Sequence, residues 1–417
     1  MELKTKYQYT YFIYPYLIDE KKYDKYILKL LKNKKCNFKI FEKEKDLDIY
    51  NYFLPEMRNF LFPTFEFRDK VLRDFKILSK EKKAKIIAKQ DVACFSYELD
   101  KDIQGKVGNE DGIFFNIEKI EIICFKTGIC FFAMKTNLEN TNEFRDLLNF
   151  NYRFREINSE FLTLKNFENI KIQTDIFNDV KDISELIYQI TGIYKENKKN
   201  EEITSSQFYT FSYLCLENKC WNDKSDFGWI EGDFYKYANV LPSNYSSDFN
   251  KENLELNLHV IDRFKYSKIA LTNLSSNIIS SGVDIFNFTK LPYQYENEYF
   301  YTYILALYQK MFLRKINLKI KNIESLNFVR NQFINFTKQI WEKEITNEDS
   351  GALYYKTLKN TLELEELYKS IENKYEILYK DLNIDKNNTY SSIIILLLIF
   401  SLIFNTINIL FIMYLLR

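Results

Sequence analysis

The residues that could bind a metal ion are carboxylates that stand close together late in the chain. Glu342, Glu344, Glu348 and Asp349 fall beside a predicted break between helices. Hard cations such as magnesium take oxygen ligands, so these four are the candidate ligands of a magnesium site. The alternative is a solvated helix end whose acids offset the helix dipole.

A second acidic group surrounds Trp221 and a Gly-Trp segment at Gly228 and Trp229. Its members are Asp223, Asp226, Glu231 and Asp233. The segment is a candidate binding loop. The alternative, which we favour, is a tryptophan packed beneath a polar loop.

Catalytic signatures are missing from the sequence. His259 is the only histidine, and it stands between Leu258 and Val260, so we expect a packed or surface side chain rather than a triad member. No phosphate-binding glycine motif occurs. We therefore predict a protein that is not an enzyme, with no catalytic residues and no bound cofactor apart from the magnesium considered above.

The cysteines and the net charge exclude further classes of site. Six cysteines occur without a CxxC pair, which predicts buried, reduced thiols rather than a zinc site. The formal net charge is +1, whereas nucleic-acid-binding domains carry a basic excess. The lysines between Lys80 and Lys89 are expected to form a solvated helix face, and no nucleic-acid partner is predicted.

The elements that would position these residues begin with an α/β region over 1–193. Its clearest feature is a hairpin of Ile120–Phe125 and Ile129–Met134, with Gly128 in a three-residue loop. A polar linker is predicted over 194–206, because that stretch has little apolar content. A second β-rich region is predicted over 207–293, with strands at 208–216, 229–240 and 269–275.

A helical stalk is predicted over 294–388. Apolar residues recur at helical spacing from Phe300 to Leu318 and from Leu326 to Ile340. Thr346 and Asp349 fit a capping box that begins the next helix. A heptad seam follows, consisting of Leu364, Tyr368, Ile371, Tyr375, Leu378 and Leu382. From Asn347 to Leu382 this coiled-coil stalk would extend about 50 Å.

A transmembrane tail is predicted over 389–417. Ser391 to Leu416 contains no charged residue, and about 20 apolar residues suffice to cross a bilayer. Lysines precede this stretch and only Arg417 follows it, which predicts a single-pass protein of the cell membrane with its N-terminal body in the cytoplasm. Asn405 and Asn408 share a helix face. They predict either self-association through amide contacts or a lone helix that tolerates them, with equal weight.

Two segments carry a resemblance to a known family. Residues 303–310 resemble the helix before the stalk of bacterial CorA-like proteins, and residues 341–351 resemble the break between their stalk helices. The resemblance to CorA-type divalent cation channels covers roughly the last 120 residues. That family has two transmembrane helices and a Gly-Met-Asn signature, whereas this chain has one predicted helix and no glycine after Gly351.

These observations predict an α+β fold, with an N-terminal α/β cytoplasmic region, a long helical stalk with a heptad seam, and one C-terminal transmembrane helix. Two functions remain open. The first is a membrane-anchored, oligomeric scaffold or sensor without catalytic activity, with the lipid bilayer and further copies of the chain as partners. The second, which the resemblance implies, is a reduced CorA-like channel or transporter for divalent metal cations.

Overall fold

Strands rich in aromatic and β-branched residues build one mixed sheet in the computed structural model. The fold is α+β, and the described strands form a single twelve-stranded sheet. The structure describes residues 2–99, 104–107, 113–138, 141–155, 171–173, 181–193, 203–205, 207–223, 226–245, 258–320, 326–377, 394–401, 404 and 406.

The strands come from both halves of the chain. In chain order they are β1 (Thr5–Leu17), β2 (Cys36–Phe38), β3 (Val92–Tyr97), β4 (Gln104–Val107), β5 (Ile113–Phe125), β6 (Ile129–Asn137), β7 (Lys171–Gln173), β8 (Lys181–Asp182), β9 (Tyr209–Leu216), β10 (His259–Ile261), β11 (Ser267–Leu271) and β12 (Ser275–Ser281). Their order in the sheet is β10-β11-β12-β9-β1-β6-β5-β4-β7-β8, and β3 joins β5 to β2. Of the described pairs, only β9 with β12 is parallel.

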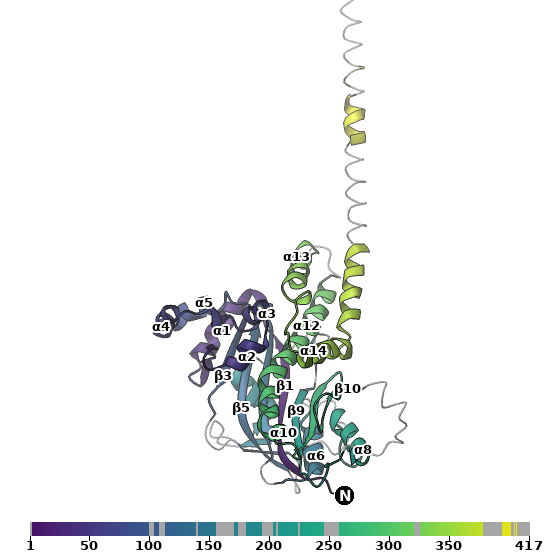
Figure 1. The fold of residues 1–417 in the computed structure, drawn as a ribbon. Helices are drawn as coiled ribbons and strands as arrows, with labels where there is room; N and C mark the ends of the chain where they lie inside the picture. The colour runs from purple at the N-terminus through teal and green to yellow at the C-terminus, as the bar shows by residue number, and fades with distance from the viewer. Residues whose placement is uncertain are drawn as a thin grey trace, which may run out of the picture.

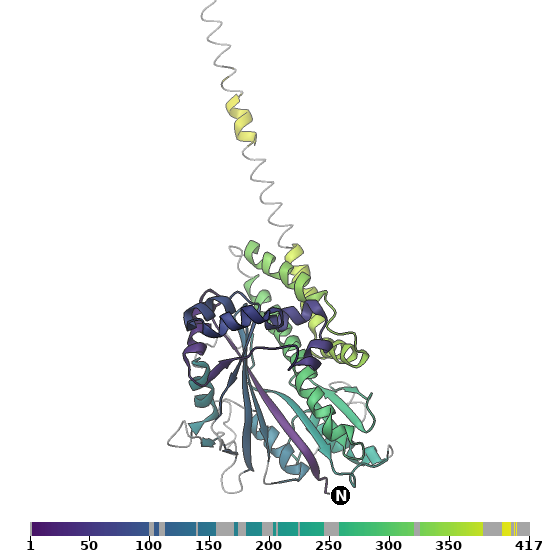
Figure 2. The ribbon, with the colours of Figure 1, turned by 60° about the vertical axis from the view of Figure 1, so that its left-hand side comes forward.

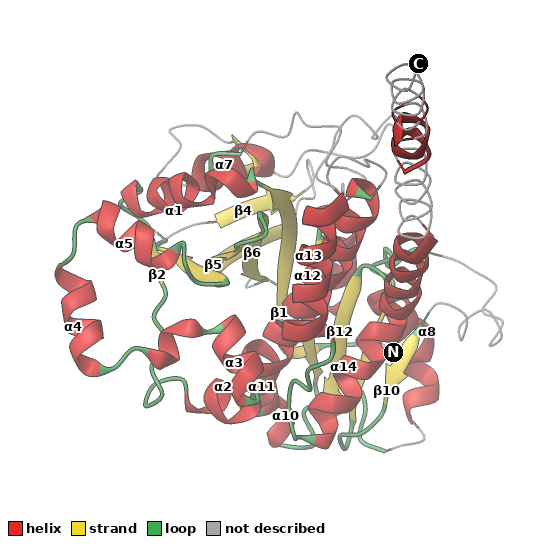
Figure 3. Cartoon of the chain, turned by 90° about the horizontal axis from the view of Figure 1, so that it is seen from above, coloured by secondary structure: helices red, strands yellow, loops and turns green. Residues whose placement is uncertain are grey.

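The helices lie on both faces of this sheet (Figure 3). They are α1 (Tyr23–Lys32), α2 (Leu47–Tyr52), α3 (Pro55–Leu61), α4 (Asp69–Ile77), α5 (Lys80–Ile87), α6 (Phe144–Phe154), α7 (Ile183–Thr191), α8 (Phe227–Ala238), α10 (Phe286–Thr289), α11 (Leu291–Gln294), α12 (Phe300–Lys319), α13 (Leu326–Phe336) and α14 (Asp349–Thr361). A helix over 364–377 follows α14. Two π-helical turns, η6 (Tyr295–Tyr299) and η8 (Thr337–Trp341), adjoin α12 and α13.

The central strands are buried on both faces, which makes the fold a three-layer arrangement. On β1, Tyr9, Tyr11 and Ile13 belong to one hydrophobic core, while Phe12 and Tyr16 belong to the other. This alternation follows from the two-residue period of a strand. The first core packs under α2, α3, α12 and α14, and the second under α1, α5, α6, α7 and α8.

The predicted boundary at 194–206 does not interrupt the sheet. Strand β1 pairs with β6 on one side and with β9 on the other, so that Tyr9 lies opposite Tyr213. In Figure 2 the purple strand β1 lies among strands of both halves. Regions 1–193 and 207–293 therefore share one sheet and its two cores.

Two local predictions can be compared directly with the structure. The hairpin is confirmed, because β5 and β6 pair across a turn in which Gly128 has φ +82°. The strand predicted over 229–240 is wrong, because these residues lie largely in α8. Ile230, Phe234 and Tyr237 are buried at helical spacing, and tertiary packing overrides their β propensity.

The prediction of a long stalk is wrong. The helix that begins at Asp349 ends at Thr361, and Glu363 has φ +56°, a conformation that a continuous helix does not allow. The apolar seam packs within the chain: Leu364 and Ile371 are buried in the first core, and Tyr368 stacks on Trp341 at 4.5 Å. Leu378 and Leu382 lie outside the described residues. Figure 1 shows the helix over 364–377 beside α13 and α14.

The prediction of a transmembrane tail is also corrected. Within the ranges that the structure describes, no helix is both long enough and apolar enough to cross a membrane. This finding overturns the single-pass placement in the cell membrane. Asn405 and Asn408 lie outside the described residues.

Candidate functional site

A cavity with two basic side chains lies against the second half of α12. Its volume is about 400 Å³. We call it the basic pocket, and it is lined by Thr204, Ser205, Tyr209, Asn273, Leu274, Lys310, Arg314 and Glu363. Four segments that are distant in sequence therefore meet there: 203–205 with the start of β9, the β11–β12 turn, α12, and the turn after α14.

Helix α12 can carry basic residues into the interior because it is buried on almost every side. Its residues from Phe300 to Leu313 are all buried, which is the pattern of a helix enclosed within a core. Gln309 Nε2 donates a hydrogen bond to the Tyr355 hydroxyl at 2.7 Å and so ties α12 to α14. Lys310 and Arg314 are four residues apart and share one helix face.

The β11–β12 turn is fixed by hydrogen bonds to its neighbours. Within the turn, Thr272 N donates to Ser275 O at 2.9 Å, and their hydroxyl groups lie 2.7 Å apart. Thr210 N of β9 donates to Leu274 O at 2.9 Å. These bonds hold the Asn273 amide at the edge of the basic pocket.

Lys310 is a buried lysine that lacks an ion-pair partner in the described part of the chain. The residue is 6% exposed, and its Nζ donates a hydrogen bond to Asn273 Oδ1 at 3.4 Å. Burial, together with the Arg314 charge, lowers the Lys310 pKa to about 8, while Glu363 opposes the shift. Keeping this ammonium group charged at neutral pH therefore lowers the stability of the folded state.

The other polar groups of the basic pocket are mainly hydrogen-bond donors. Burial raises the pKa of Tyr209, and the nearby Arg314 charge only partly offsets this effect, so the phenol keeps its proton. Thr204 and Ser205 add hydroxyl groups. Glu363 is exposed and contributes the one carboxylate of the lining. Two cations against one acid leave the lining with a net positive charge.

A set of buried charges near the start of the same helix has the opposite character. We call it the ion-pair network, and its main members are Lys39, Lys119, Glu121, Lys135 and Glu296. Glu121 is 2% exposed and lies 2.7 Å from Lys39 Nζ and 3.3 Å from Lys119 Nζ. Glu296 of η6 lies 2.8 Å from Lys135 Nζ and accepts a 2.6 Å hydrogen bond from the Tyr11 hydroxyl.

The pKa shifts of four groups in the ion-pair network, Lys39, Lys135, Glu121 and Glu296, all favour the charged form. Burial alone would raise the pKa of Glu121, but Lys119 and Lys39 lower it to about 2. Burial would lower the pKa of Lys39 and of Lys135, but their carboxylate partners raise both above the ordinary value. This network fastens η6 and α12 to the sheet and leaves no free cation for a ligand.

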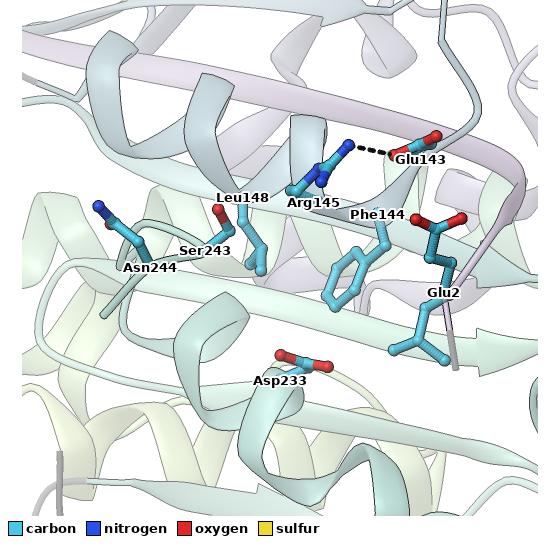
Figure 4. A pocket seen from close by; sticks show the side chains of 9 residues that line it. Glu2, Glu143, Phe144, Arg145, Leu148, Asp233, Ser243 and Asn244 are labelled. Carbon is cyan, nitrogen blue, oxygen red and sulfur yellow. Dashed lines mark hydrogen bonds and ion pairs between the residues drawn. The ribbon is translucent and has the colours of Figure 1, made fainter. Parts of the chain in front are cut away.

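A second cavity, of about 260 Å³, lies near the N-terminus between α6 and α8 (Figure 4). Its charged lining residues are Glu2, Glu143, Arg145 and Asp233. The Arg145 guanidinium is already paired with Glu143 at 2.9 Å. Because the only cation of its lining is already paired with a carboxylate, this cavity is a weaker candidate for binding an anion than the basic pocket.

The four predicted metal ligands do not converge. Glu342, Glu344, Glu348 and Asp349 are all exposed, and Asp349 pairs with Arg263 at 3.2 Å. No group of three metal-binding side chains is found among the residues that the structure describes. Helix α14 begins at Asp349, and Thr346 Oγ1 accepts from the Glu348 N–H at 3.1 Å rather than capping the helix as predicted.

The remaining predicted residues lie apart from the basic pocket. His259 is exposed at the start of β10, and its Nδ1 lies 3.0 Å from the Thr361 hydroxyl. Of the two tryptophans beside the second acidic group, Trp221 is packed, with 3% exposed, whereas Trp229 is 90% exposed on α8. Nearby, Asp226 accepts hydrogen bonds from the backbone of Asn222 and Asp223, and Asp233 pairs with Lys236 at 3.3 Å. Of the six cysteines, five are buried and Cys220 is half-buried, and all have free thiols.

Sequence reasoning missed Lys310 and Arg314. The available signal was a pair of basic residues four apart inside an apolar helix, because such residues are rarely buried without a partner. The other walls of the basic pocket come from distant segments, which the sequence pattern does not connect.

Comparison with known proteins identifies no relative. No family model, curated protein or solved structure matches this chain. The resemblance to CorA-like proteins therefore stays a prediction, and the basic pocket must be interpreted from its own chemistry.

Proposed function

We propose that this protein is a non-catalytic binding protein, in effect a sensor, for a small oxyanion that carries a phosphate or carboxylate group. The observation that carries the proposal is the basic pocket, in which Lys310 and Arg314 face a cavity of about 400 Å³ without an ion-pair partner among the described residues. This proposal keeps the predicted sensor role and omits the membrane anchor.

The donor chemistry of the basic pocket supports an oxyanion. An ammonium and a guanidinium group form charge-assisted hydrogen bonds to phosphate and carboxylate oxygens, and the guanidinium can bind in a bidentate manner. The hydroxyl groups of Thr204, Ser205 and Tyr209 can donate to further oxygens. A divalent cation would meet two positive charges here and is disfavoured.

The placement of the basic pocket supports a role in sensing. A bound anion would contact α12, the β11–β12 turn and the segment before β9 together, and so would connect elements that are distant in sequence. Glu363 lies at the turn that joins α14 to the helix over 364–377. Binding would therefore change the electrostatic environment of this turn. Such a change could alter the orientation of the helix over 364–377 relative to α14.

Titration of the purified full chain with inorganic phosphate, followed by isothermal calorimetry, tests the proposal. Wild type should bind one phosphate. Lys310→Met and Arg314→Gln should each weaken binding about tenfold or more, since a hydrogen bond to a charged group contributes about 1.5–3 kcal/mol.

The matched control is Lys319→Gln. Lys319 is also on α12, but it pairs with Glu20 at 3.6 Å and does not line the basic pocket. This variant should bind phosphate as wild type does. An equal loss in all three variants, or no binding by wild type, would show that the basic pocket is not an anion site.

A further inference from the structure

We propose that the Lys310 amine reacts reversibly with carbon dioxide and forms a carbamate in the basic pocket. The amine lies on a cavity wall beside Arg314, and no carboxylate in the described residues holds it as a paired ammonium. This modification site goes beyond the proposed function and does not require that another anion binds.

The reaction balances without an oxidant or a reductant. The lone pair of the neutral amine forms a bond to the carbon of carbon dioxide, and one carbon–oxygen π pair moves onto oxygen. The nitrogen then releases one proton to solvent. The products are a carbamate with one negative charge and one proton.

Charge balance in the basic pocket selects this product. Before the reaction, an ammonium and a guanidinium share a half-enclosed cavity, which is an unfavourable like-charge pair. After the reaction, a carbamate anion lies beside the Arg314 guanidinium and forms an ion pair. A Schiff base with a carbonyl compound would be an iminium cation when protonated and would keep the repulsion, so the same charges favour carbon dioxide.

The protonation state of Lys310 is consistent with the reaction, which needs a neutral amine. The charged and titratable groups that face Lys310 are Arg314, Glu363 and Tyr209. Burial and Arg314 lower the pKa of the Lys310 amine to about 8, and Glu363 acts in the opposite sense. Lys39 and Lys135 are buried too, but their carboxylate partners raise their pKa values and keep them charged.

Hydrogen-bond donors for the two carbamate oxygens lie on the same cavity wall. They are the hydroxyl group of Ser205 and the protonated phenol of Tyr209. The carbamate would occupy the place of a bound oxyanion, so phosphate and carbon dioxide should compete for the basic pocket.

The experiment is carbon-13 NMR of the full chain in labelled bicarbonate at pH 8, followed by chemical trapping of the carbamate and peptide mass mapping. We expect a carbamate signal that maps to Lys310. It should be absent in Lys310→Arg, several-fold weaker in Arg314→Gln, and suppressed by added phosphate.

Lys315→Arg is the matched control. Lys315 is half-buried on α12, and burial lowers the pKa of its amine too, but it pairs with Glu20 at 3.5 Å, and this variant should keep the signal. A carbamate that maps only to other amines, or none at pH 8, would overturn the proposal. Lys310→Arg separates the two proposals, because it keeps the positive charge for phosphate and removes the amine that carbon dioxide needs.

Discussion

Buried lysines lie near both ends of the helical segment formed by η6 and α12, and their surroundings differ. At the η6 end, Lys135 is held by Glu296, and Lys39 is held nearby by Glu121. About 20 Å further along the segment, Lys310 lies in the basic pocket with no carboxylate bonded to it in the described residues. Burial acts to lower the pKa of the amine in both environments, and at Lys39 and Lys135 the carboxylate partners more than offset it.

The comparison distinguishes charges that stabilise the fold, in the ion-pair network, from charges that could bind a ligand, in the basic pocket. In the ion-pair network, each carboxylate compensates the desolvation of its lysines, and the charges orient η6 against the sheet. In the basic pocket the desolvation of Lys310 is not compensated, and the pKa of its amine falls to about 8. An uncompensated buried charge beside a cavity is a candidate for function, because it lowers stability unless something binds.

The largest effect is expected from breaking the ion-pair network. Glu121→Gln would leave Lys39 and Lys119 without their shared carboxylate, and removing one partner of a buried pair costs about 3–5 kcal/mol. Urea unfolding at pH 7 should show this loss. Glu42→Gln, which breaks a surface pair with the exposed Lys45, should cost far less. Equal costs would mean that burial does not strengthen the network.

The loss of stability at acid pH should depend on the same carboxylate, that of Glu121. The ordinary pKa of Glu121 is 4.5, and in the fold it falls to about 2. The folded state therefore binds fewer protons in this window, and the contribution of Glu121 is complete above pH 4.5 and lost as the pH falls towards 2. The difference in unfolding free energy between wild type and Glu121→Gln should shrink over that range, and a constant difference would contradict the account.

In the basic pocket, removing a charged side chain is expected to increase the free energy of unfolding rather than to decrease it. Lys310→Met removes an uncompensated charge and keeps the apolar stem, so it should stabilise the protein by about 1–3 kcal/mol at pH 7. Between pH 8 and 10.5 the folded amine loses its proton before the unfolded amine does, so wild type gains stability and the advantage of the variant shrinks. Urea unfolding across this range measures both effects, and a destabilised variant at pH 7 would mean that Lys310 has a structural role.

The smallest effect is expected at the rim of the basic pocket. Glu363 is exposed and contributes the one negative charge of the lining. Glu363→Gln should tighten phosphate binding a few-fold, because an exposed charge contributes up to about 1 kcal/mol. Calorimetry at low and high salt should show the gain only at low salt. Weaker binding in the variant would mean that Glu363 helps to hold the ligand.

Local structure could be predicted where it depends on neighbouring residues. The Lys-Thr-Gly turn at 126–128 and the helical periodicity of α12 are examples. The architecture could not be predicted, because β1 and β9 pair across some 200 residues. The seam through Leu364 and Ile371 has the spacing of a coiled coil, but apolar spacing does not tell whether the partner is another copy or the chain's own core.

The basic pocket escaped prediction for the same reason. Lys310 and Arg314 are adjacent on one helix, whereas Ser205, Asn273 and Glu363 are brought to them by the fold. The carboxylates that are close in sequence, from Glu342 to Asp349, point to solvent instead. Spacing within one segment therefore predicted a metal site, while the positively charged cavity arises from tertiary contacts.

The pKa of the Lys310 amine, followed by NMR of carbon-labelled lysine with and without phosphate, tests the central claim most directly. The account predicts a pKa near 8 in the free protein and an increase when phosphate binds, since the anion supplies the missing partner. An unperturbed pKa near 10.5 that phosphate leaves unchanged would show that Lys310 is neither desolvated nor part of an anion site.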